Sequence, residues 1–150
     1  MRIPIEIVNE QLEVNAIVHA PKCRIGMALV DFVVDTGSNV SFISYKDALR
    51  LNIPFNTLKF REHMHLGGTK FNLCEINGIE LSFDAEGNEN CIKKISLKTF
   101  SVATTTKKTE EGIEYAKQIP SLLGLDFLRS AGLALYANPS KNIAYLEREG

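Results

Sequence analysis

Short apolar segments, separated by glycine, proline or polar turns, recur along the whole chain and constrain its fold more than any other feature. Residues 12–19 alternate apolar and polar side chains, which is typical of a half-buried strand. Residues 27–34 are rich in valine and phenylalanine, which favour strands. No apolar run approaches the roughly 18 residues of a membrane-spanning helix. The pattern predicts a mostly β protein, and 150 residues amount to a single domain, 1–150.

Three further pairs of strands are expected, and each pair flanks a turn. They are residues 60–66 and 69–76 around Gly67-Gly68, residues 79–83 and 92–102 around 84–88, and residues 133–136 and 142–146 around 138–140. Gly67 and Gly68 both accept positive φ, which favours a tight hairpin turn. Ser44 is expected to cap a short helix, and Asp126 another that ends at Gly132. The polar segment 103–118 is expected to be a surface loop without a packing role.

Charge and composition exclude several functional classes. Seventeen Lys and Arg against eighteen Asp and Glu leave a net charge of -1, so a general attraction to nucleic acid or anionic membranes is not indicated. An apolar content of 45% with 23% charged residues excludes a disordered or collagen-like chain. The first residues show no secretory signal, and a cytoplasmic location is therefore expected.

The three cysteines, Cys23, Cys74 and Cys91, are odd in number and widely spaced. They fit neither a disulfide framework nor a Cys-x-x-Cys metal knuckle. Buried thiols in a reducing compartment are the favoured interpretation. A bridge between two of them and a reactive thiol remain open alternatives.

The most informative motif is Asp35-Thr36-Gly37, which lies between two apolar segments. The two valines before Asp35 predict that its carboxylate is partly desolvated. Gly37 lets backbone amides approach the carboxylate, and the hydroxyls of Thr36 and Ser38 can orient it. An aspartate that only caps a turn is the structural alternative, and the apolar segments on both sides weigh against it.

A second motif, Leu122-Leu123-Gly124, places two bulky aliphatic residues before a glycine and a predicted helix. The order of an apolar strand with Asp-Thr-Gly, a glycine-tipped hairpin and then Leu-Leu-Gly resembles the retropepsin-like aspartic proteases, over roughly residues 12–146. The resemblance implies an all-β fold, a closed β-barrel with a flap hairpin and one or two short helices. Ser38 and Asn39 follow the cellular rather than the retroviral pattern of this family.

The resemblance also implies site residues, on the positions that match the family motifs. Asp35 would be the catalytic aspartate, within the catalytic motif that Thr36 and Gly37 complete, and Thr36 would hydrogen-bond across a dimer. Contacts to a peptide or protein substrate would come from the loop, the flap and the Leu-Leu-Gly strand. The implied substrate-binding residues are Ser38, Asn39, Leu66, Gly67, Gly68 and Leu123, with Gly67-Gly68 as the flap tip. No cofactor and no metal is expected.

A single Asp-Thr-Gly implies a homodimer if the family resemblance holds. Enzymes of this kind bring two carboxylates to one water molecule, and the chain offers one such motif. The remaining aspartates, which no Thr-Gly or Ser-Gly follows, are Asp31, Asp47, Asp84 and Asp126. A second copy must therefore supply the other carboxylate across a two-fold axis. The implied activity is that of an aspartic endopeptidase.

Two other functions remain possible on the sequence. A dimeric peptide-binding module could keep the same fold without turnover. A metal- or ligand-binding β domain could use His63 and His65, which share one face of a predicted strand. The second alternative needs a further ligand from elsewhere in the chain.

Overall fold

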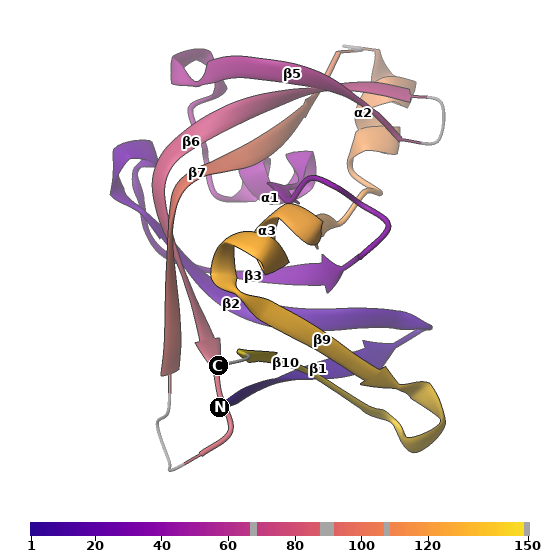
Figure 1. Ribbon diagram of the computed structural model, residues 1–150. Helices are drawn as coiled ribbons and strands as arrows, with labels where there is room; N and C mark the ends of the chain where they lie inside the picture. The colour runs from indigo at the N-terminus through magenta and orange to yellow at the C-terminus, as the bar shows by residue number, and fades with distance from the viewer. Residues whose placement is uncertain (67–68, 88–91, 107–108, 149–150) are drawn as a thin grey trace.

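The computed structural model describes residues 1–66, 69–87, 92–106 and 109–148, and most of them form strands (Figure 1). The strands are β1 (Arg2–Val8), β2 (Gln11–Ala20), β3 (Ile25–Val34), β4 (Phe42–Ile43), β5 (Lys59–Leu66), β6 (Thr69–Asp84), β7 (Ile92–Thr105), β8 (Ser121–Leu123), β9 (Leu133–Asn138) and β10 (Ile143–Arg148). The α-helices are α1 (Tyr45–Arg50), α2 (Glu110–Ala116) and α3 (Leu125–Ala131), and short 3₁₀ turns are η1 (Pro21–Cys23), η2 (Phe55–Thr57) and η3 (Pro139–Lys141).

Six strands within the described part of the chain close into a ring. Their order is β2, β3, β8, β4, β7 and β6, and pairing between β6 and β2 completes the circuit. β5 extends this ring from β6, while β1, β10 and β9 extend it from β2 (Figure 1). The prediction of a mostly β fold is therefore confirmed. The prediction of one or two short helices is wrong, because the described residues form three α-helices.

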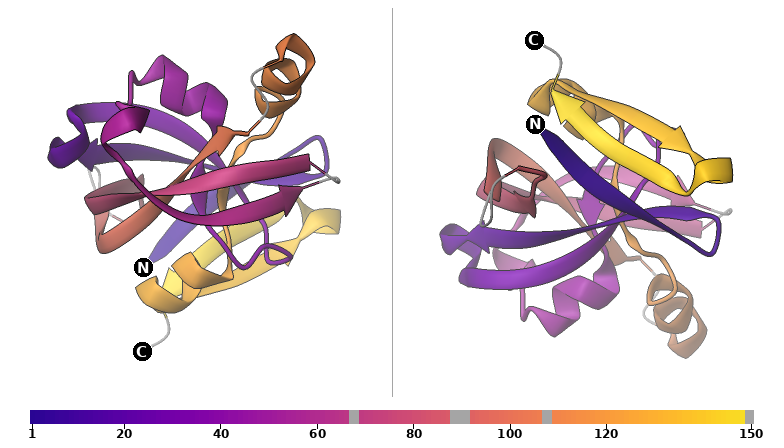
Figure 2. Two further views of the ribbon diagram at one scale, coloured as in Figure 1. Left: turned by 90° about the horizontal axis from the view of Figure 1, so that it is seen from above. Right: turned by 90° about the horizontal axis from the view of Figure 1, so that it is seen from below.

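The main core follows from the alternation of side chains along the strands. In β2, Val14, Ala16 and Val18 are buried, and the residues between them are more exposed. Buried side chains from β1, β10, α1 and α3 join the same apolar cluster. A second, smaller cluster has Phe42, Leu73, Ala103 and Leu122 at its centre. Figure 2 shows α2 and the β9–β10 hairpin on opposite sides of the molecule.

The two predicted helices are present, and one cap differs from the prediction. Ser44 caps α1 as predicted, because its Oγ accepts a hydrogen bond from Asp47 N at 3.1 Å. Gly132 ends α3 with a φ of 64°, also as predicted. Asp126 does not cap α3, which follows Gly124 with no side-chain cap. The Asp126 carboxylate instead contacts a distant loop.

The prediction of a loop over residues 103–118 is wrong. β7 continues to Thr105, and α2 begins after Thr109, whose hydroxyl accepts a hydrogen bond from Gly112 N at 3.2 Å. Gly112 and Ala116 are buried against the rest of the protein. Charged side chains occupy the exposed positions of this short helix. The composition of the segment therefore does not indicate that one of its faces is buried.

Two strands also differ from the predicted set. β1 is absent from the predictions, although Ile3 and Ile5 alternate with exposed residues and are buried. β6 continues where two separate strands were expected, and Gly78 adopts a φ of 74° within it. Within the described residues, no helix is long and apolar enough to cross a membrane.

Cys23 and Cys74 are buried free thiols, and Cys91 lies outside the described residues. Burial raises the pKa of both thiols, because an apolar environment disfavours the thiolate. We therefore expect both to react with iodoacetamide more slowly in the native protein at pH 8 than in urea. Peptide-level mass spectrometry measures both rates, and equal labelling of native and denatured protein would contradict this burial.

Candidate active site

The loop that carries Asp35 begins where β3 ends. β3 runs parallel to β8, with Val34 opposite Leu123. The pairing continues one residue further, because Asp35 N donates a hydrogen bond to Leu123 O at 3.0 Å. The Leu-Leu-Gly strand therefore fixes the backbone from which the Asp35 side chain projects.

The Asp35 carboxylate is held through one of its two oxygens. Gly37 N donates to Oδ1 at 2.8 Å, and Ser38 N donates to the Asp35 carbonyl at 3.1 Å. Oδ2 takes part in none of the hydrogen bonds found among the described residues. The turn therefore sets the direction of the carboxylate and leaves one oxygen available to an incoming group.

The predicted desolvation of Asp35 is wrong for the single chain. Asp35, Thr36, Gly37 and Asn39 are exposed, and Ser38 is partly buried. Val34 is buried, and successive strand residues point to opposite faces, so the next side chain turns outward. The carboxylate consequently lies on a surface that another molecule can reach.

Close approach to Gly124 fixes the second half of the loop. Leu125 N donates to Ser38 O at 2.9 Å. A Cβ on Gly124 would lie 2.5 Å from Ser38 O, closer than real Cβ contacts allow, and 3.2 Å from Val40 O, a tight contact. The glycine of the Leu-Leu-Gly motif is therefore required by the loop that passes against it.

The Asp126 carboxylate holds the end of this loop by hydrogen bonds, a role that the sequence did not predict. Its Oδ2 accepts from Ser41 N at 3.1 Å, and its Oδ1 accepts from Ser41 Oγ at 2.5 Å. Ser41 Oγ in turn accepts from Gly124 N at 2.7 Å, and Ser41 is only 2% exposed. The two partners are 85 positions apart in the sequence, so no local pattern indicates their contact, although Asp126 stands two positions after Gly124.

Replacement of Asp126 by asparagine tests how much the hydrogen bonds between Ser41 and Asp126 stabilise the protein. Both Ser41 groups donate to the carboxylate, so an asparagine NH₂ would face a donor and leave it unsatisfied. We expect Asp126→Asn to lower the free energy of unfolding by about 1–3 kcal/mol in urea denaturation. Asp84→Asn, at an exposed position, is the matched control and should change stability little. Equal stability of both variants would show that the contact contributes nothing.

A buried polar chain joins α1 to β8 beneath the loop. Ser44 N donates to Ser121 Oγ at 2.8 Å, and Ser121 Oγ donates to Asp47 Oδ2 at 2.6 Å. Arg50 pairs with the other oxygen of Asp47 at 3.1 Å. These hydrogen bonds satisfy the polar groups between α1 and β8, and they hold in place the strand that pairs with β3 next to Asp35.

The β5–β6 hairpin lies over the same region and shares apolar contacts with the loop. Partly buried side chains from the hairpin, from both sides of the Asp35 loop and from the segment before β8 pack on the smaller apolar cluster. They are Val33, Val40, Met64, Leu66 and Ile119. This packing places Leu66, a predicted substrate-binding residue, in one cluster with residues that flank Asp35.

The other predicted site residues fall into three groups. Ser38 and Asn39 lie in the Asp35 loop. Leu123 is fully buried, so its side chain supports the core and its carbonyl holds Asp35. Gly67 and Gly68, the predicted flap tip, lie outside the described residues.

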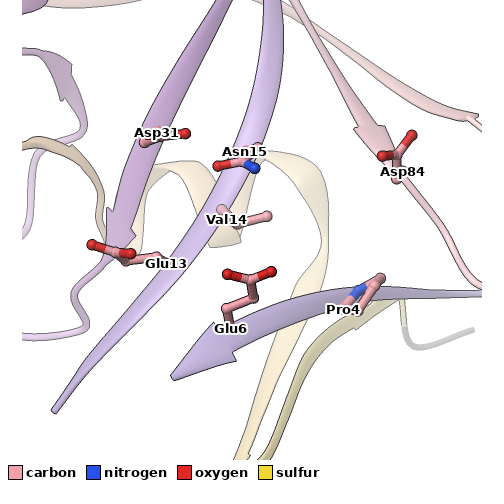
Figure 3. Close-up of a pocket in the computed structure, with 7 residues that line it drawn as sticks. All are labelled: Pro4, Glu6, Glu13, Val14, Asn15, Asp31 and Asp84. Carbon is pink, nitrogen blue, oxygen red and sulfur yellow. The ribbon is translucent and has the colours of Figure 1, made fainter. Parts of the chain in front are cut away.

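An acidic hollow lies elsewhere on the molecule, between residues of β1, β2, β3 and β6 (Figure 3). Its carboxylates are Glu6, Glu13, Asp31 and Asp84, and none of the Asp-Thr-Gly residues lines it. Within the described part of the chain, no group of three or more His, Cys, Asp or Glu residues is placed to hold a metal ion. His63 and His65, both exposed on β5, gain no third ligand there.

Two of the carboxylates in this hollow, those of Glu6 and Glu13, repel each other. Glu6 and Glu13 stand directly opposite each other on antiparallel β1 and β2. Like charges at such a pair are destabilising, so we expect Glu13→Gln to raise the free energy of unfolding by about 0.2–1 kcal/mol at low salt. Urea denaturation at low and high ionic strength checks this, because added salt screens the repulsion and should shrink the gain. A loss of stability would contradict the expectation.

Comparison with known proteins gives the class of fold. No family model and no curated protein sequence matches the chain. The crystal structure of a retropepsin-like aspartic protease from Rickettsia conorii matches it with a TM-score of 0.57 and 17% sequence identity. The match covers 99% of this chain and 91% of that chain. The chain therefore has the retropepsin-like fold over essentially its whole length.

Proposed function

We propose that this chain is an aspartic endopeptidase whose active site forms between two copies of the chain. One observation carries the proposal. In a retropepsin-like fold, Asp35 of the Asp-Thr-Gly motif projects from the end of β3, exposed, with one carboxylate oxygen held by Gly37 N at 2.8 Å. The Leu-Leu-Gly motif supports the same loop, because a Cβ on Gly124 would lie 2.5 Å from Ser38 O.

The dimer follows from the chemistry of a carboxylate dyad. The chain carries one Asp-Thr-Gly, and its Asp35 is exposed, so a second copy can bring an identical carboxylate to it across a two-fold axis. Two carboxylates in contact cannot both ionise cheaply, and they therefore share one proton. The exposed Thr36 beside each Asp35 would hydrogen-bond to the partner and brace the two loops.

The reaction needs one water molecule between the two Asp35 side chains. The ionised carboxylate takes a proton from the water as its oxygen attacks the peptide carbonyl carbon. The protonated carboxyl donates to the carbonyl oxygen, which gives a tetrahedral intermediate. This intermediate collapses as its C–N bond breaks: the carboxyl that took the proton of the water passes it to the amide nitrogen, and the other carboxylate recovers a proton from a hydroxyl of the intermediate. Because the dyad is symmetric, either Asp35 can act as acid or base.

The surroundings of the loop favour an extended substrate with apolar side chains. An extended peptide can pair with backbone at the hairpin and at the Asp35 loop. Met64, Leu66 and Val40 are partly buried apolar residues around this region and can pack on such side chains. Movement of the β5–β6 hairpin over the peptide would exclude water from the reaction. No cofactor enters this mechanism.

Cleavage of a mixed-sequence peptide library between pH 3 and 8 tests the proposal. We expect cuts between apolar residues, with a specific activity that rises with protein concentration, because dilution separates the two halves of the site. Sedimentation velocity at the same concentrations measures the dimer fraction. Activity that stays constant while the dimer dissociates would contradict a shared site. A dimer that binds peptides but cuts none would favour the peptide-binding module instead.

A further inference from the structure

Tyr115 of helix α2 contacts the end of the β5–β6 hairpin. Tyr115 donates its hydroxyl to Leu66 O, at the last residue of β5, over 3.3 Å. Its ring stacks on Phe71 of β6, with centroids 6.2 Å apart and an interplanar angle of 25°. Phe71 is only 1% exposed, so the ring rests on a fixed support. One side chain of α2 therefore contacts both strands of the hairpin.

A second contact from the same region reinforces the first. Thr106, between β7 and α2, donates its hydroxyl to Lys70 O of β6 at 2.9 Å. Thr69, the first residue of β6, borders a small hollow whose other walls include Thr109 and Tyr115 of the α2 region. Figure 1 shows α2 beside the end of the β5–β6 hairpin that lies farthest from η2. The contacts thus gather at the end where β5 stops and β6 starts.

β5 has few other restraints at this end of the hairpin. Among the described residues, β5 is an edge strand that pairs with β6 alone. Most of its side chains are exposed, and only Met64 and Leu66 are partly buried. An edge strand with so little buried surface opens locally at low cost unless another element holds it. α2 is that element, and Tyr115 makes its contacts.

We propose that Tyr115 is a positioning residue that sets how readily the end of the β5–β6 hairpin moves relative to the Asp35 loop. The role in substrate admission rests on the proposed function, because a moving hairpin matters to a peptide held at Asp35. Tyr115 itself acts through Leu66 and Phe71 and contacts no reacting atom. Loss of its hydroxyl removes the hydrogen bond to the Leu66 carbonyl while the ring stack on Phe71 remains.

Hydrogen–deuterium exchange of the whole protein tests this role without any need for activity. We expect Tyr115→Phe to speed exchange in residues 60–66 and 69–75 about two- to tenfold, the effect of one hydrogen bond on local opening. Tyr115→Ala also removes the ring stack and should speed it further. Tyr136→Phe, the same change at an exposed tyrosine of β9, is the matched control and should leave this hairpin unchanged.

Kinetics of peptide cleavage give a second readout. If the hairpin is closed over the peptide for a smaller fraction of the time, it binds the substrate and the transition state more weakly by the same amount. Tyr115→Phe should therefore raise KM more than it changes kcat. Exchange in the hairpin equal to that of the wild type in both Tyr115 variants would overturn the proposal. If the wild type cuts no peptide, the proposed function fails, and the exchange data still decide whether Tyr115 positions the hairpin.

Discussion

Asp35→Asn is expected to abolish peptide cleavage, with kcat/KM lower by at least about 10³-fold, while the protein stays folded and dimeric. Asparagine has nearly the same shape, and its side-chain oxygen can still accept from Gly37 N, as Oδ1 does at 2.8 Å. It cannot take a proton from the attacking water. The change therefore removes the proposed acid–base group and keeps the geometry of the loop.

Initial rates on the best peptide from the library, together with urea denaturation and sedimentation, check this expectation. Asp84→Asn is the matched control, because it removes the same charge from an exposed aspartate that no Thr-Gly follows. It should retain wild-type activity. Cleavage by Asp35→Asn at more than about one tenth of the wild-type rate would assign the chemistry to another group.

Gly124→Ala is expected to lower both the stability of the protein and its cleavage activity. The new Cβ would lie 2.5 Å from Ser38 O and 3.1 Å from Ser38 C, and both are backbone atoms that cannot rotate away. Relief requires the Asp35 loop or the start of α3 to shift. We expect the free energy of unfolding to fall by about 1–3 kcal/mol, with cleavage activity reduced in parallel.

Urea denaturation of Gly124→Ala beside Gly26→Ala measures this effect. Gly26 lies in β3, and a Cβ there would meet nothing within 4 Å, so its replacement should change stability little. Unchanged stability and activity in Gly124→Ala would show that the loop does not depend on the close approach. The account of how Leu-Leu-Gly supports Asp35 would then be wrong.

The local features of the fold could be predicted because the sequence carries local signals for them. The alternation in β2 matches its buried positions Val14, Ala16 and Val18, and Ser44 caps α1 through a partner three residues away. The neighbourhood of Asp35 and Leu123 was implied by resemblance, and their backbone hydrogen bond at 3.0 Å now gives it a geometry.

Long-range contacts could not be predicted from the same signals. Ser41 and Asp126 meet because β8 pairs beside both β3 and β4, and that pairing depends on the whole ring. Asp126 consequently looked like an ordinary helix cap. The exposure of Asp35 also escaped prediction, because two apolar neighbours in sequence do not reveal which face of a strand the next residue takes.

Helix α2 was not predicted, for a related reason. Its segment is dominated by charged and polar side chains, and its buried face consists of Gly112 and Ala116. Small residues bury little apolar area and give almost no periodic signal. The stack of Tyr115 on Phe71 and its hydrogen bond to Leu66 O show that this segment packs against the hairpin.

A subunit-mixing measurement tests the central claim most directly. Wild type and Asp35→Asn are mixed in equal amounts, dissociated by dilution or mild denaturant, allowed to reassociate, and assayed at fixed total protein. If the site needs Asp35 from both chains, only about one quarter of the dimers carry two aspartates, and activity should fall to about one quarter of that of wild type alone. Activity of about one half would mean that each chain works by itself, which would contradict a shared aspartate dyad.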